Sequence, residues 1–317
     1  MPGASAAAQL SVPGLWLTGL DRGLMLAGLV VALGGLAGRG LARHYKGELP
    51  GLLPGPWAVR GSLLGLAGSA ALEVTALAGP GLAAQLASPP AAGLRSGGTA
   101  QVAAVEVVLF ALAAVLARLR RPGWAALILC GVIVAEGIRS HPEGIVPVGG
   151  ALLAFCHVMP AVLWAGLLAY ALRTGIAWRH HPVAVRGVIQ LYATAAAWLF
   201  VLVLVTGIIS AVVLVPLGSV LTTAYGLFLV AKVLAVAAAA GFAVAGRRWL
   251  RREPVPGAGP SQVTRLELAV LAIVLAITGI LTVLTPPAKP ISAPTAASEP
   301  ALVLAGVHVV AHDGGPL

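Results

Sequence analysis

The sequence predicts an all-α protein: a polytopic transmembrane helix bundle of about eight spans with both termini outside. Its composition is 59% hydrophobic and only 9% charged, with a mean hydropathy of +0.98. A water-soluble domain with such values would need a mostly apolar surface. Apolar stretches long enough to cross ~30 Å of hydrocarbon recur along the chain, and basic residues cluster on alternate connections between them.

The apolar stretches are continuous and rich in Ala, Leu and Val, which favours helices over the alternating strands of a membrane β-barrel. Small residues at Gly61, Gly65 and Gly68 predict close approach of a neighbouring helix. We expect spans at Leu15–Ala37, Gly61–Ala84, Ala100–Ala117, Gly123–Ile138, Pro147–Leu172, Gln190–Val215, Thr222–Gly246 and Leu266–Thr285.

The distribution of Lys and Arg predicts the orientation. If the N-terminus is outside, 15 of these residues lie on inner connections, 4 on outer ones, and Lys232 within a span, which accounts for all 20. The positive-inside rule then places both termini outside. The first eleven residues lack a basic region and a cleavage site, so we expect the first helix to remain as an anchor.

We divide the chain into an N-terminal four-helix membrane region, 1–146, a second four-helix region, 147–287, and a flexible outer tail, 288–317. The tail begins with prolines among small residues, which is typical of an extended linker. It carries His308 and His312 at i, i+4 spacing, which would allow an outward-facing metal pair if the tail were helical.

Ionisable residues within spans are costly, by about 2.5 to 3.5 kcal/mol each on insertion scales. Glu73, His157 and Lys232 are expected near mid-membrane, Glu106 and Glu136 lie toward the outer leaflet, and Glu267 is near an inner end. If Glu73, Glu106 and Glu136 were all ionised against the single Lys232, the span interior would carry a net negative charge that a cation could offset. The alternative is a Lys232–Glu73 pair with the other acids neutral. Lys232, Glu73 and Glu267 are the candidates for a charge or proton relay.

The fifth span carries Cys156, His157 and Met159, and thiolate, imidazole and thioether suit Cu(I). Cys156 and Met159 share a helix face, but His157 points nearly opposite to Met159. All three can bind one ion only if the helix is distorted, which Pro160 would favour. The alternative for His157 is a buried structural role. The candidate metal ligands are His157, Met159, Cys156, Glu106, Glu136 and His141.

A set of motifs from the fifth span onward resembles the copper-resistance D (CopD) family of bacterial integral membrane proteins. The likeness is best over Val188–Pro287. The resembling residues are His157, Trp164 and Gly166 in CHVMPAVLWAG; Thr206 and Gly207; Thr223, Tyr225, Gly226 and Lys232 in TAYGLFLVAK; Arg247 and Arg248; Glu267 in RLELAV; and Pro286 and Pro287 in LTPP.

The resemblance implies copper transport or handling at the cytoplasmic membrane, generally inward, with copper transported or transiently bound. The expected partners are the copper ion, the lipid bilayer and a separate periplasmic copper-binding protein, with no nucleic acid. The chain has only three methionines, fewer than a strong copper-receiving surface would need.

Two alternatives remain open: a haem-binding membrane redox protein and a copper-handover factor for a cuproenzyme. A b-type haem usually needs two axial ligands, and only His157 lies well within a span, with His141 near the outer mouth, so no haem is expected. The sequence has no Walker A loop, HExxH motif or nucleophile elbow. We therefore expect no enzyme, and any transport to be downhill or proton-coupled.

Overall fold

The computed structural model describes residues 14–77, 99–140, 148–250 and 262–287, and these ranges contain helices and no strand. The prediction of an all-α bundle is confirmed. The helices are α2 (Leu15–Ala42), α3 (Ala58–Leu77), α6 (Thr99–Arg118), α7 (Pro122–Ile138), α9 (Gly149–Ala177), α10 (Pro182–Leu214), the short 3-10 helix η1 (Leu217–Ser219), α11 (Ala224–Leu250) and α12 (Gln262–Leu281).

Each of the eight expected spans overlaps one α-helix of the described chain. Six of these helices are long and apolar enough to cross a membrane: α2, α6, α9, α10, α11 and α12. The α7 helix is apolar but has only 17 residues, and α3 is not among the six. A multi-pass membrane protein is therefore confirmed.

The largest difference in boundaries is at α10, which begins at Pro182 rather than at the expected Gln190. Pro182 occupies the first helical turn, where its fixed φ and missing N–H are tolerated. Hydropathy marks only the apolar part of a helix, and α10 continues about two turns beyond it. Pro160 lies within α9, and that helix continues past it to Ala177.

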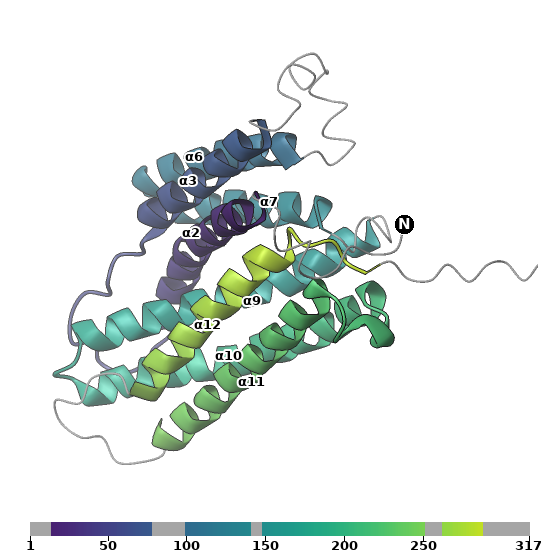
Figure 1. Ribbon diagram of the computed structural model, residues 1–317. Coiled ribbons are helices and arrows are strands. Elements are labelled where there is room, and N and C mark those ends of the chain that lie inside the picture. The colour runs from purple at the N-terminus through teal and green to yellow at the C-terminus, as the bar shows by residue number, and fades with distance from the viewer. Residues whose placement is uncertain (1–13, 78–98, 141–147, 251–261, 288–317) are drawn as a thin grey trace, which may run out of the picture.

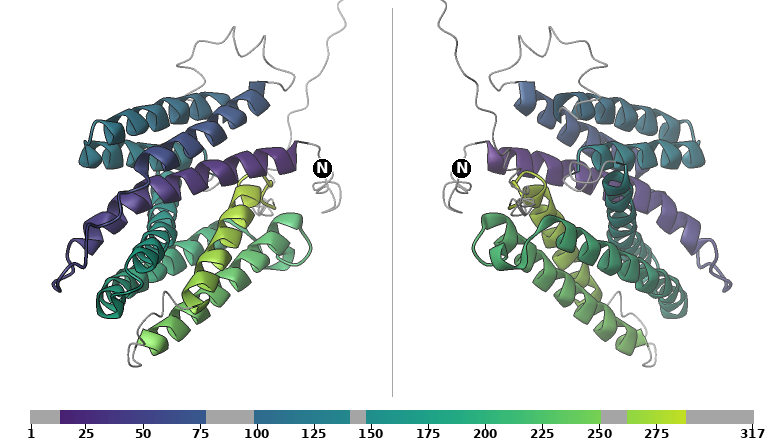
Figure 2. Two further views of the ribbon diagram at one scale, coloured as in Figure 1. Left: turned by 90° about the vertical axis from the view of Figure 1, so that its left-hand side faces the viewer. Right: turned by 90° about the vertical axis from the view of Figure 1, so that its right-hand side faces the viewer.

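The helices form layers around α2 and α9 (Figures 1 and 2). The α3 and α6 helices lie on one side and α10 and α11 on the opposite side, with α2 and α9 between them. One hydrophobic cluster includes Met25 of α2, Phe110 of α6, Leu129 of α7 and Leu168 of α9. Helices on both sides of the predicted boundary between residues 146 and 147 thus share a core.

Glycines set the closest helix contacts, as predicted for Gly61, Gly65 and Gly68 of α3. A Cβ on Gly61 or Gly68 would overlap backbone atoms of α2, and one on Gly65 would overlap the Phe110 ring. A Cβ on Gly166 of α9 would overlap the backbone at Gly34 of α2. Small residues allow these backbones to approach, as in other membrane helix pairs.

Candidate functional site

His157 of α9 faces α10 and contacts Thr206. The Nδ1 atom of His157 lies 3.0 Å from the Oγ1 atom of Thr206. A Cβ on the next residue, Gly207, would come within 3.2 Å of the ring carbon Cε1. Thr206 and Gly207 therefore form the α10 surface against which the imidazole rests.

The hydrogen bonds of Thr206 favour one tautomer of a neutral His157, whose ring also interacts with the backbone of Val203. The Thr206 hydroxyl donates to the carbonyl of Leu202 at 2.6 Å, and a hydroxyl has one proton to donate. It therefore accepts from Nδ1–H of His157. A neutral ring then has an unprotonated Nε2 whose lone pair can bind a metal ion. In metal sites, a ligating histidine is commonly held in this way through its other ring nitrogen.

Lys232 of α11 is the charged neighbour of this pair. His157, Thr206 and Lys232 each lie eight residues from the same end of the bundle, at the start of α9, the end of α10 and the start of α11. At 1.5 Å per residue, all three are ~12 Å from their helix ends. Lys232 interacts electrostatically with the His157 ring. We call these three residues the outer cluster, after the side of the membrane on which the positive-inside rule is expected to place them.

Cys156 and Met159 do not join His157 on this face. Cys156 is exposed and so lies on the surface of α9, whereas Met159 packs against the hydrophobic core. The helix α9 continues through Pro160 without a break, so successive residues remain about 100° apart around its axis and the three side chains point in different directions. In the described part of the chain, no three His, Cys, Asp or Glu side chains gather closely enough to hold a metal ion.

A second polar cluster, the inner cluster, joins Trp164 of α9, Tyr192 of α10 and Glu267 of α12. Oε1 of Glu267 accepts from the Tyr192 hydroxyl at 2.5 Å and from Nε1 of Trp164 at 3.3 Å. Trp164 Nε1 also lies 3.1 Å from the Tyr192 hydroxyl oxygen, which accepts from it. The Glu267 carboxyl is buried, with the residue 2% exposed.

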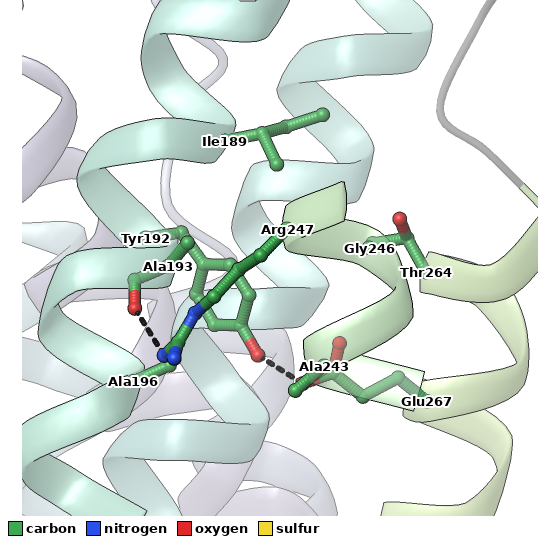
Figure 3. Close-up of a pocket in the computed structure, with 9 residues that line it drawn as sticks. All are labelled: Ile189, Tyr192, Ala193, Ala196, Ala243, Gly246, Arg247, Thr264 and Glu267. Carbon is green, nitrogen blue, oxygen red and sulfur yellow. Dashed lines mark hydrogen bonds between the residues drawn. The ribbon is translucent and has the colours of Figure 1, made fainter. Parts of the chain in front are cut away.

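A cavity of about 20 Å³ lies beside the inner cluster, enough for one water molecule. Its walls include Tyr192, Thr264 and Glu267, with Arg247 of α11, whose side chain runs beside Tyr192 (Figure 3). Arg247 donates to the Ala193 carbonyl at 2.9 Å. Within the described residues, no ion pair within 4.0 Å joins Arg247 to Glu267.

An aromatic pair lies between the outer and inner clusters. The rings of Trp164 and Phe200 meet edge to face, with centroids 5.6 Å apart. On α10, Phe200 follows Tyr192 by ~12 Å along the axis and precedes Thr206 by ~9 Å. The polar atoms of the two clusters are thus separated by an apolar contact.

Glu106 and Glu136, two of the candidate metal ligands, are paired with a guanidinium group. Nη2 of Arg139, at the end of α7, donates to both carboxylate oxygens of Glu106, at 3.0 and 3.2 Å, and also contacts Glu136. Arg139 and Glu106 are fully or almost fully buried. Their oxygens are therefore engaged by a protein cation in this structure.

Arg22 of α2 changes the expected charge balance of this region. Arg22 and Arg139 are two of the four basic residues that the sequence places on outer connections, but both side chains are buried against the helices. Arg22 interacts electrostatically with both glutamates and donates to the Thr282 carbonyl at 2.8 Å. The expected excess of negative charge in the outer half was wrong, because two arginines balance these two carboxylates.

The structure also separates Glu73 from Lys232. Glu73 lies on α3, which packs against α2 and α6, whereas Lys232 lies on α11, which packs against α12 and α10. Figure 1 shows α3 and α11 on opposite sides of the bundle. The alternative of a Lys232–Glu73 pair was wrong, since α3 and α11 have other helices between them.

The TAYG motif organises the N-terminal end of α11. The hydroxyl of Thr223 accepts from the Gly226 N–H at 3.1 Å, as in a helix N-cap, and donates to the Ser219 carbonyl at 2.8 Å. Tyr225 is buried in a cluster with Leu214 and Leu281. A Cβ on Gly226 would overlap the Val220 backbone. These three motif residues thus position α11, and with it Lys232.

Some site residues escaped the sequence reasoning, and others lie outside the described chain. Tyr192 and Arg139 were missed because one looks like an ordinary aromatic within a span and the other like a loop cation. The i, i+7 spacing of His157 and Trp164, both bonded to α10, was the available signal for the inner cluster. His141, His308 and His312 lie outside the described residues.

Comparisons with known proteins agree with the motif resemblance. The model of the family described as copper resistance protein D matches residues 186–284, about a third of the chain. This segment includes Lys232, Arg247 and Glu267 but not His157 or Trp164. No curated protein and no solved structure matches the chain. The resemblance is thus confirmed: residues 186–284 match the copper resistance protein D family, which indicates a membrane protein of copper resistance or copper handling.

Proposed function

We propose that this chain imports copper across the cell membrane and that Nε2 of His157 is a ligand along the path. The observation that carries the proposal is the contact between His157 Nδ1 and Thr206 Oγ1, which are 3.0 Å apart. Thr206, on α10, lies within the segment that matches the family model. With Nδ1–H donating to Thr206, Nε2 is the ligand atom of a half-buried ring.

A single protein ligand suits a transient contact better than storage. A soft Cu(I) ion accepts imidazole nitrogen readily, and low coordination allows it to leave as well as enter. The nearest sulfur atoms in sequence belong to Cys156 and Met159, and both residues lie on other faces of the same helix. A separate periplasmic copper-binding protein is the proposed donor of the ion.

Lys232 is the proposed charge relay of this step. A copper cation on His157 and an ammonium group on Lys232 repel each other in a medium of low dielectric constant. Arrival of copper therefore favours loss of the Lys232 proton. Such an exchange would move a proton against each copper ion without an ATPase domain.

The experiment is copper uptake by proteoliposomes under reducing conditions, followed by a copper-sensitive dye inside the vesicles. His157→Ala should abolish uptake, whereas His181→Ala, which removes an exposed histidine at the start of α10, should leave it unchanged. Uptake by His157→Ala equal to that of the unaltered protein would contradict the proposal. Copper bound at His157 without any uptake would indicate handover to another protein.

The direction of movement is tested in cells. Expression of the chain should raise cellular copper if the protein imports the ion, and the increase should disappear with His157→Ala. A decrease in cellular copper on expression would show export instead.

A further inference from the structure

The inner cluster carries an inference that does not depend on copper. We propose that the cavity between α10, α11 and α12 is a proton-binding site, with Glu267 as the proton acceptor and Arg247 as the counter-charge of its ionised form. The site is distinct from the outer cluster and takes a proton delivered by a water molecule.

The hydrogen bonds of Glu267 suit both of its protonation states. Tyr192 and Trp164 both donate to Oε1, and neither bond involves Oε2. When the carboxyl group is ionised, Oε1 accepts these two bonds. When a proton binds to Oε2, Oε1 becomes the carbonyl oxygen and still accepts them. The group therefore changes charge without rearranging its donors.

The cavity has room for the water molecule that delivers the proton. It is large enough for one water molecule and is lined by Glu267 and Arg247. A hydronium ion that enters transfers one proton to Oε2 and remains as water, so the carboxylate becomes a neutral carboxyl group. The reverse step returns the proton to water. No other reactant is required.

The charges around Glu267 fit this role. The titratable or charged groups that act on it are Tyr192 from α10 and Arg247 from α11, while α9 contributes the non-titrating Trp164. An ionised carboxylate in an apolar interior is costly without a counter-charge. Arg247 provides that charge from another wall of the cavity rather than in a direct ion pair. The Glu267 carboxylate can therefore still bind a proton.

The position of the cavity determines the side from which the proton comes. Arg247 lies in the last turn of α11, and Glu267 lies five residues after the start of α12. Both therefore belong to the end of the bundle that the positive-inside rule predicts to be cytoplasmic. The edge-to-face pair of Trp164 and Phe200 closes the cluster toward His157.

The test is infrared difference spectroscopy of copper-free protein in proteoliposomes as the pH is changed. Acidification should produce a protonated carboxyl C=O band that is absent in Glu267→Gln and retained in Glu48→Gln, which removes an exposed carboxyl. The same band in Glu267→Gln, or no difference between Glu267→Gln and the unaltered protein on acidification, would overturn the proposal.

Tyr192→Phe provides a second measurement that does not require loss of the carboxyl group. Removal of the hydroxyl takes a hydrogen bond from Oε1, so the C=O band should shift to higher frequency, and Trp198→Phe should leave it in place because Trp198 is 71% exposed. An unshifted band in Tyr192→Phe would assign the proton to another group. Because no metal is present, failure here leaves the copper proposal standing, and the reverse is also true.

Discussion

Nδ1 of His157 lies 3.0 Å from Oγ1 of Thr206, and that hydroxyl donates its only proton to the Leu202 carbonyl at 2.6 Å. The threonine therefore acts on the histidine as an acceptor. It holds the ring against α10 and leaves Nε2 unprotonated in the neutral form. A side chain at mid-membrane that could be a packing residue is thus oriented as a ligand would be.

Replacement of Thr206 should weaken copper binding without removing the histidine. Thr206→Val leaves Nδ1–H without its acceptor and frees the ring to turn, so we expect a loss of affinity of about 10- to 100-fold. Thr206→Ser keeps the hydroxyl and should bind nearly normally. Competition with a chromogenic Cu(I) chelator measures both. Equal affinities for the valine and serine variants would contradict the orienting role.

Copper affinity should depend on pH through Lys232. A copper cation on the neutral His157 ring repels the nearby ammonium group, so copper binding is expected to release the Lys232 proton and affinity should rise with pH. Lys232→Met removes this proton. Its affinity should exceed that of the unaltered protein at low pH, and its dependence on pH should be shallower. A slope unchanged by the substitution would remove Lys232 from the relay.

Arg139 should be essential to stability because it balances two buried carboxylates. Arg139→Met leaves Glu106 and Glu136 without their direct partner, and breaking a buried pair in this way costs about 3 to 5 kcal/mol. Thermal unfolding in detergent should show a clear fall in midpoint, which the exposed substitution Arg118→Met should not cause. Adding Glu106→Gln to Arg139→Met leaves one carboxylate, that of Glu136, against Arg22 and should recover much of the loss. Without recovery, the contribution of Arg139 is packing rather than charge.

The crossing of α2 and α9 should tolerate no side chain at Gly166. An added methyl group would overlap the backbone at Gly34, and overpacking of this kind costs about 1 to 3 kcal/mol. Gly241→Ala is the matched control, since a Cβ there has nothing within 4 Å and alanine favours the helix. Detergent unfolding should place Gly166→Ala below the unaltered protein and Gly241→Ala at or above it. The reverse order would contradict the close crossing.

Much of the fold follows from the sequence because each membrane span requires a long apolar stretch, and such stretches can be recognised from the sequence alone. Apolar stretches of sufficient length predict helices whatever they pack against, so all eight expected spans overlap helices. The ends are less predictable, as α10 shows, because a helix continues beyond its apolar part when capping and packing permit. The glycines at Gly61 and Gly68 also gave a reliable signal, since close contact in lipid depends on residue size alone.

The sequence by itself determined the class of protein, the helices and the intramembrane residues that need a partner. Only the tertiary structure decided which residues are their hydrogen-bond partners: Arg139 for Glu106, Thr206 for His157, and Tyr192 with Trp164 for Glu267. The physical reason is that the free-energy cost of placing an ionisable side chain in the membrane depends only on that residue and on its position within its span. Its compensation depends on which faces of distant helices meet, and hydropathy carries no information about that.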